Sequence, residues 1–589
     1  MSLFPQSELH FQLYECLDTE SLLTRPRFAE HSIDTFNAVL DTAEKIAMDL
    51  FLPHNAAADQ TEPQFDGQTV TMLDDVKVAY DAFCDAGFVA ARFDFEDGGM
   101  QLPETIMTGC SGFFMAANPS TTAYPFLTTA AANVIKHFAS ESLQTQFLPK
   151  MLTGEFSGTM ALTEPHAGSG LADITTAAQP TEYAHYLIKG SKLYISGGDH
   201  QLSSNIVHLV LAKIPGGPAG VKGISLFIVP KFRLDDNGHP TTQNDVTLAG
   251  LIHKLGYRGT TSTALTFGEN DDCHGYLVGE PHKGLQYMFM MMNEARVGVG
   301  FGAAMIGYRG FQYSLAYAKE RIQGGKPIVE HGDVKRMLLL QKSYSEGALN
   351  LCFYGARLVD DMHTHEDESV RQGSAQLLDL LTPVIKAWPS EYGPKANDLA
   401  IQVMGGAGYT REYPVEQFWR DNRLNPIHEG TNGIQALDLM GRKLWQNNQA
   451  GLIELQNRFQ QDLGQATGHV SVQCAKAITP FLAQLPQIIE LIGQDLQSEE
   501  QANTLTNAMS FMEIFSSIII SWMWLRQVIV AEQTLHQSVK LSSEQESFYQ
   551  GKCQTGLFYI QTQLPLIQPH FDLLTRHDNS CSVMQTTWF

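Results

Sequence analysis

Apolar residues recur with helical spacing along the first quarter of the chain. From residue 32 to about residue 150 they return every three or four positions, most clearly between Thr35 and Leu50. Pro53 and the glycines at 67, 87, 98 and 99 interrupt this pattern and divide it into several helices. The pattern predicts an N-terminal helical domain over residues 36–155. It also predicts an N-terminal extension over residues 1–35, where apolar and polar residues are mixed.

Short apolar runs bounded by turn residues replace this spacing from about Gly154. Short runs of this kind, bounded by turn residues, are typical of antiparallel strands. We therefore expect a middle β-domain over residues 156–280. The predicted strands are Tyr186–Ile188 and Leu193–Ile195, on either side of a Lys-Gly-Ser-Lys turn, and the runs 206–214, 223–230 and 264–267.

Helical spacing returns after Gly284 and continues to the C-terminus. Val334, Met337, Leu338 and Leu351 fit one face of a long helix. The pattern predicts a C-terminal helical bundle over residues 281–450 and an additional helical domain over residues 451–589. The most apolar stretch, residues 514–525, contains three serines and is too short for a membrane span. The expected fold class is mainly α with a central antiparallel β-domain.

Composition excludes several classes of protein. Of the 589 residues, 43% are hydrophobic and 17% are charged, which excludes a disordered chain and a small disulfide scaffold. The net charge of −24 disfavours binding to nucleic acid. The eight scattered cysteines include no C-x-x-C pair, so we expect free thiols and no metal site. The first residues show no secretory signal pattern, and we expect a cytoplasmic protein.

Three glycine-rich segments are candidate ligand sites. Residues 160–170 and 192–198 each combine hydroxyl groups with glycines, which offer donors to an anionic or heteroaromatic ligand. Taken alone, each segment is more simply interpreted as an ordinary turn. Residues 402–409 predict either a helix cap or a phosphate cradle. No G-x-G-x-x-G motif follows a predicted strand, so a Rossmann site is not supported.

A fourth segment carries a candidate base. Glu429 lies between His428 and Gly430, just before a predicted apolar helix, and a glycine here would let a substrate approach the carboxylate. A partly desolvated glutamate has a raised pKa and becomes a better proton acceptor near neutral pH. The alternative is an acid that stabilises the start of the helix.

Taken together, these segments resemble the acyl-CoA dehydrogenase flavoproteins over roughly residues 36–445. The resemblance implies that family's fold, with an extra C-terminal helical domain like that of the extended bacterial subfamily, which includes the 3-methylmercaptopropionyl-CoA dehydrogenases. The matching segments, in family order, are ALTEPHAGSG (161–170), YISGG (194–198), KLGYRGTTST (254–263), AKERIQGGKP (318–327), QVMGGAGY (402–409) and HEGTNGIQ (428–435).

The resemblance implies FAD-dependent α,β-dehydrogenation of an acyl-CoA thioester, with Glu429 as the base that removes the α proton. It implies substrate contacts at Ser169, Arg296 and Gly430. It also implies a homodimer or higher assembly, because Arg321 would reach the FAD of a neighbouring subunit, and an electron-transferring flavoprotein as electron acceptor. The residues expected to bind FAD are Leu162, Thr163, Ser169, Tyr194, Ile195, Ser196, Arg321, Gln402, Gly405, Gly406, Thr431 and Asn432.

Three positions depart from the family pattern: His428 replaces a tyrosine, Gly170 replaces an acid with Asp173 nearby, and Gly433 replaces a larger side chain. We expect a fatty acyl-CoA as substrate, with 3-methylmercaptopropionyl-CoA as the alternative. The rival from another class is a nucleic-acid-binding flavoprotein of the alkylation response. Residues 451–589 disfavour it, since they hold six Lys and Arg against twelve Asp and Glu. An acyl-CoA oxidase is a further alternative, disfavoured because the chain ends in Gln-Thr-Thr-Trp-Phe rather than a peroxisomal signal.

Overall fold

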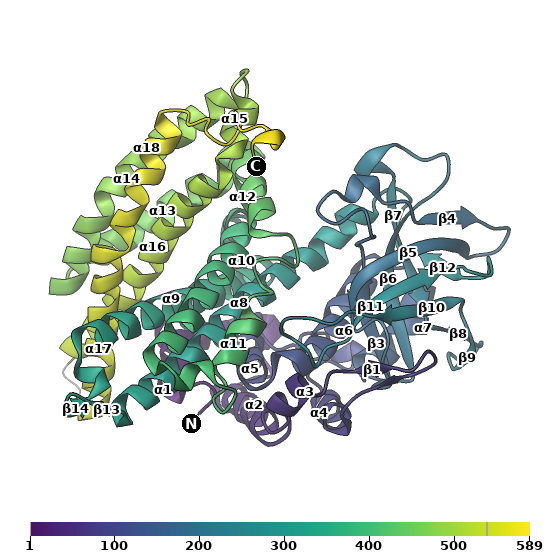
Figure 1. Cartoon of the computed structure of the whole chain (residues 1–589), viewed down its shortest axis with the longest axis horizontal. Coiled ribbons are helices and arrows are strands. Elements are labelled where there is room, and N and C mark those ends of the chain that lie inside the picture. Colours follow the sequence, from purple (N-terminus) through teal and green to yellow (C-terminus); the bar gives the residue numbers. More distant parts are fainter. Residues whose placement is uncertain (1, 538–539) are drawn as a thin grey trace. The chain divides into compact units, whose positions relative to one another are not determined.

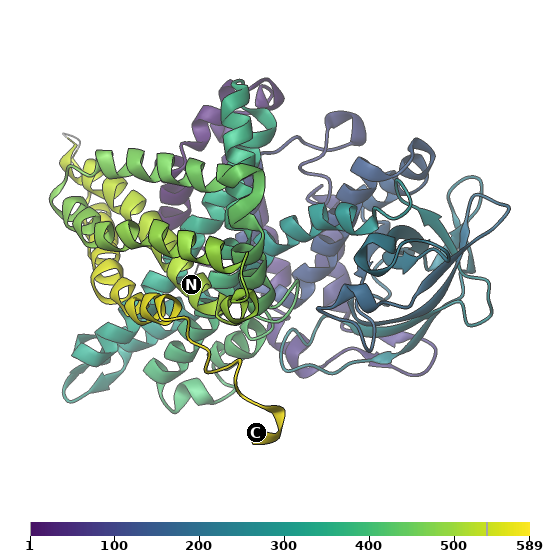
Figure 2. The ribbon, with the colours of Figure 1, turned by 90° about the horizontal axis from the view of Figure 1, so that it is seen from above.

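The computed structural model describes residues 2–537 and 540–589, and Figures 1 and 2 show its helices and strands from two directions. Two compact units make up the chain. The first contains residues 33–295, and the second contains residues 2–32 together with residues 296–589. The N-terminal segment thus belongs to the same unit as the C-terminal half of the chain.

The first unit begins with helices whose ends follow from local sequence. Helix α6, for example, starts where the Asn118 side chain accepts a hydrogen bond from the Thr121 backbone N–H at 3.1 Å, with Pro119 in the first turn. The buried faces of these helices carry the apolar positions that recur in the sequence. The helices are α2 (Ile33–Ile46), α3 (Asn55–Gln60), α4 (Asp74–Asp85), α5 (Glu104–Ala117), α6 (Pro119–Phe138) and α7 (Glu141–Leu152).

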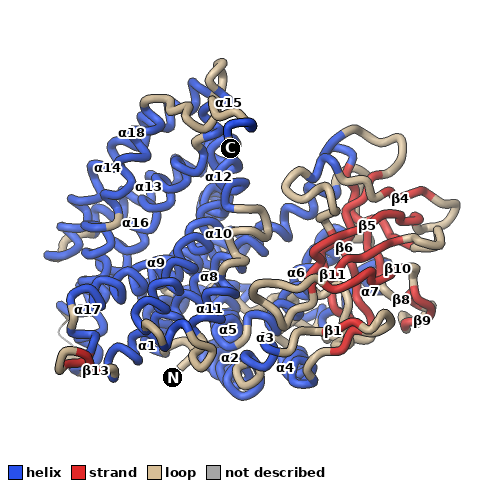
Figure 3. Tube along the Cα trace, in the orientation of Figure 1, coloured by secondary structure: helices blue, strands red, loops and turns tan. Residues whose placement is uncertain are grey.

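An eight-stranded sheet follows, in the order β10-β11-β5-β12-β7-β6-β3, with β4 paired to β5 and β6. Figure 3 shows the strands in red. Most neighbours are antiparallel, as expected, but β3 and β6 run parallel. Apolar clusters cover both faces of the central strands, which explains their continuous apolar runs. The strands are β3 (Phe156–Ala161), β4 (Ala177–Pro180), β5 (Tyr186–Ser196), β6 (Asn205–Lys213), β7 (Ile224–Pro230), β10 (Val246–Leu251), β11 (Ser262–Phe267) and β12 (His274–Leu277).

The turn predicted at Lys-Gly-Ser-Lys is wrong. Strand β5 continues through these residues from Tyr186 to Ser196. Gly190 serves close packing instead, because a Cβ there would lie 2.4 Å from the Thr176 hydroxyl oxygen. Lys192 is buried rather than solvated, because its ammonium pairs with Glu164.

Long helices form the core of the second unit. Helix α9 (Gly332–Thr364) carries the predicted apolar face and packs along α10 (Glu368–Met404). Helices α8 (Gly284–Glu320), α11 (Val415–Asn422) and α12 (Asn432–Gly441) complete the bundle. A short hairpin, β13 (Ile322–Gln323) and β14 (Lys326–Pro327), follows α8.

The C-terminal extension adds six further helices to this unit. Among the described residues, α16 is the one helix long and apolar enough to cross a membrane, but 89% of its most apolar window is buried. It contacts α9, α12, α14 and α17, so its apolar composition is explained by its place in the core. The helices are α13 (Ala450–Gln465), α14 (His469–Asp495), α15 (Gln501–Thr506), α16 (Ala508–His536), α17 (Ser543–Thr562) and α18 (Gln568–Thr575).

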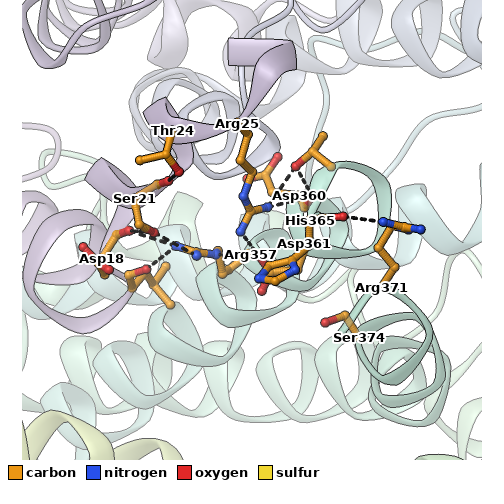
Figure 4. Close-up of polar contacts among 12 residues, drawn as sticks. Asp18, Ser21, Thr24, Arg25, Arg357, Asp360, Asp361, His365, Arg371 and Ser374 are labelled. Carbon is orange, nitrogen blue, oxygen red and sulfur yellow. Dashed lines mark hydrogen bonds and ion pairs between the residues drawn. The ribbon is translucent and has the colours of Figure 1, made fainter. Parts of the chain in front are cut away.

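Arginines join the N-terminal segment to α9, as Figure 4 shows. The Arg25 guanidinium lies 2.5 Å from the Asp361 carboxylate, and both side chains are nearly buried. Arg357 donates to the same carboxylate at 3.0 Å and to the Asp18 carbonyl at 2.9 Å. Charge-assisted hydrogen bonds of this kind fix a segment whose sequence pattern is otherwise irregular.

A buried lysine completes this attachment. The Lys552 ammonium on α17 donates to Glu8 at 2.6 Å, to Glu346 on α9 at 2.9 Å and to Gln527 at 3.2 Å. All of these side chains are buried. The lysine therefore connects the N-terminal segment, the bundle and the C-terminal extension through charge-assisted hydrogen bonds.

We predict that K552M destabilises the protein by about 3–5 kcal/mol, because two buried carboxylates lose their shared partner. Chemical denaturation of the full chain, followed by fluorescence, measures the change. K77M serves as the matched control, since Lys77 forms an exposed ion pair with Asp81 and its loss should have little effect. Equal stability of K552M and K77M would contradict the structural role of the buried network.

Candidate active site

A strained loop before α12 holds Glu429. Its φ is +53°, a left-handed backbone conformation that is uncommon for a residue other than glycine, and Gly430 follows with φ +84°. The Gln435 side chain donates to the carbonyls of Glu429 at 3.2 Å and of Gly430 at 3.4 Å. A Cβ on residue 430 would lie 2.7 Å from the Gln435 amide nitrogen, so glycine is required for this close approach.

The start of α12 anchors this loop to α10. The Thr431 hydroxyl caps the helix by accepting from the Ile434 N–H at 3.3 Å. The Asn432 amide oxygen accepts from the buried Lys386 ammonium at 3.1 Å, and its amide nitrogen donates to the Ala387 carbonyl at 3.4 Å. Glu429 precedes this capped turn and is not one of the residues that caps it, which disfavours the helix-starting alternative.

The electrostatic environment of Glu429 suits a base. Burial raises the pKa of Glu429, while the Arg296 and Lys386 cations act in the opposite direction. Arg296 is itself buried and lies 3.7 Å from the Asp438 carboxylate. The carboxyl group therefore has a higher proton affinity than an exposed glutamate and two cations that favour its ionised form.

His428 contributes no positive charge to Glu429. Burial lowers the pKa of His428 to about 3, and Lys386 acts in the same direction, so the ring is neutral near pH 7. The His428 ring therefore does not act on Glu429 through its charge at this pH. Its Nε2 atom is buried and has no hydrogen-bond partner among the described residues.

A second group of predicted residues meets in the first unit, where the end of β3 lies beside β5. The Leu193 N–H donates to the Thr163 carbonyl at 2.9 Å, and the Lys192 ammonium donates to the Leu162 carbonyl at 2.9 Å. Tyr194 has φ +61° and its side chain is 61% exposed. Ser196 is also exposed, whereas Ile195 is buried in the sheet. An exposed aromatic ring beside hydroxyl groups fits a flat heteroaromatic ligand.

A buried ion pair that the sequence analysis did not select supports this strand end. Glu164 accepts from Lys192 at 3.0 Å and from the Thr176 hydroxyl at 2.6 Å. Burial alone would raise the pKa of Glu164, but Lys192 and the Thr175 and Thr176 hydrogen bonds lower it to about 2. The sequence contained a signal for this pair, because Glu164 lies in the candidate segment 160–170 and Lys192 lies in the candidate segment 192–198.

The remaining predicted residues are exposed. Ser169 follows Gly168 in an exposed loop. At position 170, where the family often has an acid, this chain has glycine, and a Cβ there would lie 3.4 Å from the Asp173 carboxylate. Asp173 therefore lies beside the position of the family's acid. Arg321 follows α8 at the surface, and Gln402 lies near the end of α10. Gly405 caps α10 with φ +60°, as the sequence predicted, and both Gly405 and Gly406 border open space that a ligand could approach.

Family models cover most of the chain. The acyl-CoA dehydrogenase N-terminal domain matches residues 34–155, the middle domain matches residues 159–269 and the C-terminal domain matches residues 282–444. A fourth model, described as acetyl-CoA dehydrogenase C-terminal like, matches residues 456–585.

Individual proteins match over nearly their whole length. The chain is 32% identical to the 3-methylmercaptopropionyl-CoA dehydrogenase of Ruegeria pomeroyi, covering 91% of this chain and 92% of that protein. It is 33% identical to a butyryl-CoA dehydrogenase of Syntrophomonas wolfei, covering 96% and 95%. The solved acyl-CoA dehydrogenase of Bacillus anthracis complexed with FAD shares the fold with a TM-score of 0.72 at 20% identity, over 95% of this chain and 90% of that one.

Proposed function

The chain belongs to the acyl-CoA dehydrogenase family, and on this premise we propose that it is an oxidoreductase that converts an acyl-CoA thioester to the trans-2-enoyl-CoA with FAD as cofactor. One observation carries the proposal. Glu429 presents a carboxylate of raised pKa from a strained loop, next to a glycine and two buried cations. This arrangement suits removal of a weakly acidic proton from a substrate that lies against Gly430.

The reaction requires a base because the α C–H bond of a thioester is a weak acid. Glu429 removes the α proton, and the Glu429 backbone N–H stabilises the developing enolate oxygen. FAD, when bound, accepts the β hydrogen as hydride. Arg296, buried beside Asp438, keeps the environment of Glu429 positive before the proton is transferred. Gly430, where a side chain would meet Gln435, is the position against which the proposal places the thioester.

The resemblance assigns two groups of residues to the cofactor. Leu162, Thr163, Tyr194, Ile195 and Ser196 are assigned to the flavin. The exposed ring of Tyr194 and the exposed hydroxyl group of Ser196 support this assignment. Ser169 would lie near both the cofactor and the thioester arm. Arg321 is assigned to the pyrophosphate of FAD, and Gln402, Gly405 and Gly406 are assigned to its adenine half. Thr431 and Asn432, which follow the base, are also assigned to FAD.

The proposal also covers the oligomeric state, the electron acceptor and the cellular location of the enzyme. The exposed Arg321, Gly405 and Gly406 accompany exposed apolar side chains at Ile322 and Tyr409, which are 61% and 85% exposed. Ile322 is next to Arg321 in the sequence and Tyr409 follows the glycines at 405 and 406, so each part of the proposed interface carries an exposed apolar side chain. We assign a homodimer or higher homo-oligomer, an electron-transferring flavoprotein as electron acceptor, and a cytoplasmic location. The domain boundaries at residues 35, 155, 280 and 450 are part of the same proposal.

We expect E429Q to retain FAD and to bind acyl-CoA, while anaerobic bleaching of the flavin by substrate slows by about 10²–10⁴-fold. Glutamine keeps the size of the side chain but cannot accept a proton at neutral pH. Stopped-flow absorbance of the flavin measures the rate. Bleaching of E429Q at the wild-type rate would place the base elsewhere.

A fatty acyl-CoA is the substrate class that we favour, and we expect straight-chain saturated thioesters to bleach the flavin. The identity to the Ruegeria pomeroyi enzyme supports one alternative, 3-methylmercaptopropionyl-CoA. Anaerobic bleaching with short, medium and long acyl-CoAs and with the methylthio thioester, compared by kcat/KM, separates the two. A preference for the methylthio compound over every straight chain would assign the alternative.

We expect R321A to weaken FAD retention by about tenfold or more and to reduce assembly at the same time, because a charge-assisted bond to a pyrophosphate is lost. FAD dissociation and sedimentation velocity measure the two effects. R336A removes an arginine that is likewise exposed but is paired with Asp333, and it serves as the control. Unchanged FAD affinity in R321A would remove Arg321 from the cofactor site.

A further inference from the structure

Lys386 is one of the two buried cations near Glu429, and the proposed function gives it no specific role. It lies in the middle of α10, its side chain is inaccessible to solvent, and its neighbours along the helix are apolar. Its ammonium donates to the Asn432 amide oxygen at 3.1 Å. Among the described residues no carboxylate lies within 4 Å of this ammonium, although a buried ammonium is costly unless an anion compensates its charge.

We propose that Lys386 is a positioning residue for Glu429: it holds the start of the base loop through Asn432, and its charge keeps the carboxylate ionised before the proton is transferred. This inference rests on the proposed function, in which Glu429 is the base. It adds a residue on another helix that sets how readily the base accepts a proton.

The charges around Lys386 support this assignment. Among the described residues, Glu429 is the anion whose charge acts on Lys386, while Arg296 from α8 repels it. Burial lowers the pKa of Lys386 to about 7, and Glu429 opposes this change, so the lysine is charged at acidic pH, where the base becomes protonated. His428 is neutral, and Glu391 on α10 lies 3.4 Å from the other end of the Asn432 amide rather than beside the ammonium.

Arg296 cannot replace this contribution in full, because its charge is shared. Its guanidinium lies 3.7 Å from Asp438, which also accepts from Arg442 at 2.6 Å. Lys386 has no such carboxylate partner, so its charge is directed to Glu429 and to the Asn432 amide. Coupling between two buried charges is reciprocal, so removal of the lysine must raise the proton affinity of the glutamate.

The test compares the pH dependence of flavin bleaching in the wild type, K386M and K386Q. Removal of a nearby cation should move the acid limb of the profile to a pH about 1 unit higher, because a positive charge at this range depresses a carboxyl pKa by about that much or more. Below the new limb, bleaching should be about tenfold slower than in the wild type. K386Q keeps a hydrogen-bonding group, so it retains the anchor to Asn432 and isolates the effect of charge.

K443M is the matched control. Lys443 is also buried, but it pairs with Asp379 and does not act on Glu429, so its loss should leave the acid limb in place. Bound FAD per chain confirms that each variant is folded. An acid limb that stays at the wild-type pH in both K386M and K386Q would overturn the inference. Should K386M fail to fold, K386Q alone decides the question.

A second measurement does not depend on turnover. The infrared band of the protonated Glu429 carboxyl group, identified by its absence in E429Q, reports the protonation of the base during a pH titration. Its midpoint should rise in K386Q and stay unchanged in K443M; an unchanged midpoint in K386Q contradicts the inference. Failure of the proposed function is distinct, because it would appear as wild-type bleaching by E429Q whatever the behaviour of the lysine variants.

Discussion

The candidate active site depends on one constraint: a carboxyl group must be buried enough to become a good base and yet stay ionised. Burial raises the pKa of Glu429, and two buried cations, Arg296 and Lys386, counteract this rise. The strained backbone at Glu429 fixes the position of its side chain. The Gln435 amide holds this backbone by donating to the carbonyls of Glu429 and Gly430. Geometry and charge at this loop therefore come from three helices that converge on it, α8, α10 and α12.

The C-terminal extension takes part in supporting this loop. Helix α12, which follows the base, packs against α16 of the extension as well as against α10. The Lys552 network joins the extension to α9 and to the N-terminal segment. Because buried ion pairs are costly to break, the extension, the bundle and the N-terminal segment are expected to unfold together. This explains why the compact unit that holds Glu429 includes residues from both ends of the chain.

Local pattern was sufficient for much of the fold. Helix α9, strand β6 and the cap at Gly405 follow from apolar spacing and glycine placement, and Glu429 was visible from its neighbours. Pattern failed where long-range contacts decide the structure. The Lys-Gly-Ser-Lys segment continues as a strand because it pairs with β11, and Lys192 is buried there because it pairs with Glu164 in the loop after β3. Lys386 was not selected, although a single charge in an apolar helical run was a visible signal.

The central claim is that this chain removes a proton from the α carbon of an acyl thioester. Anaerobic single turnover with α,α-dideuterated acyl-CoA, followed by mass spectrometry of the product, tests it directly. The account predicts slower flavin bleaching than with the unlabelled substrate, because the α C–D bond is broken at Glu429, and an enoyl product that has lost one of the two deuterium atoms. A product that keeps both deuterium atoms, formed without an isotope effect, would contradict the account.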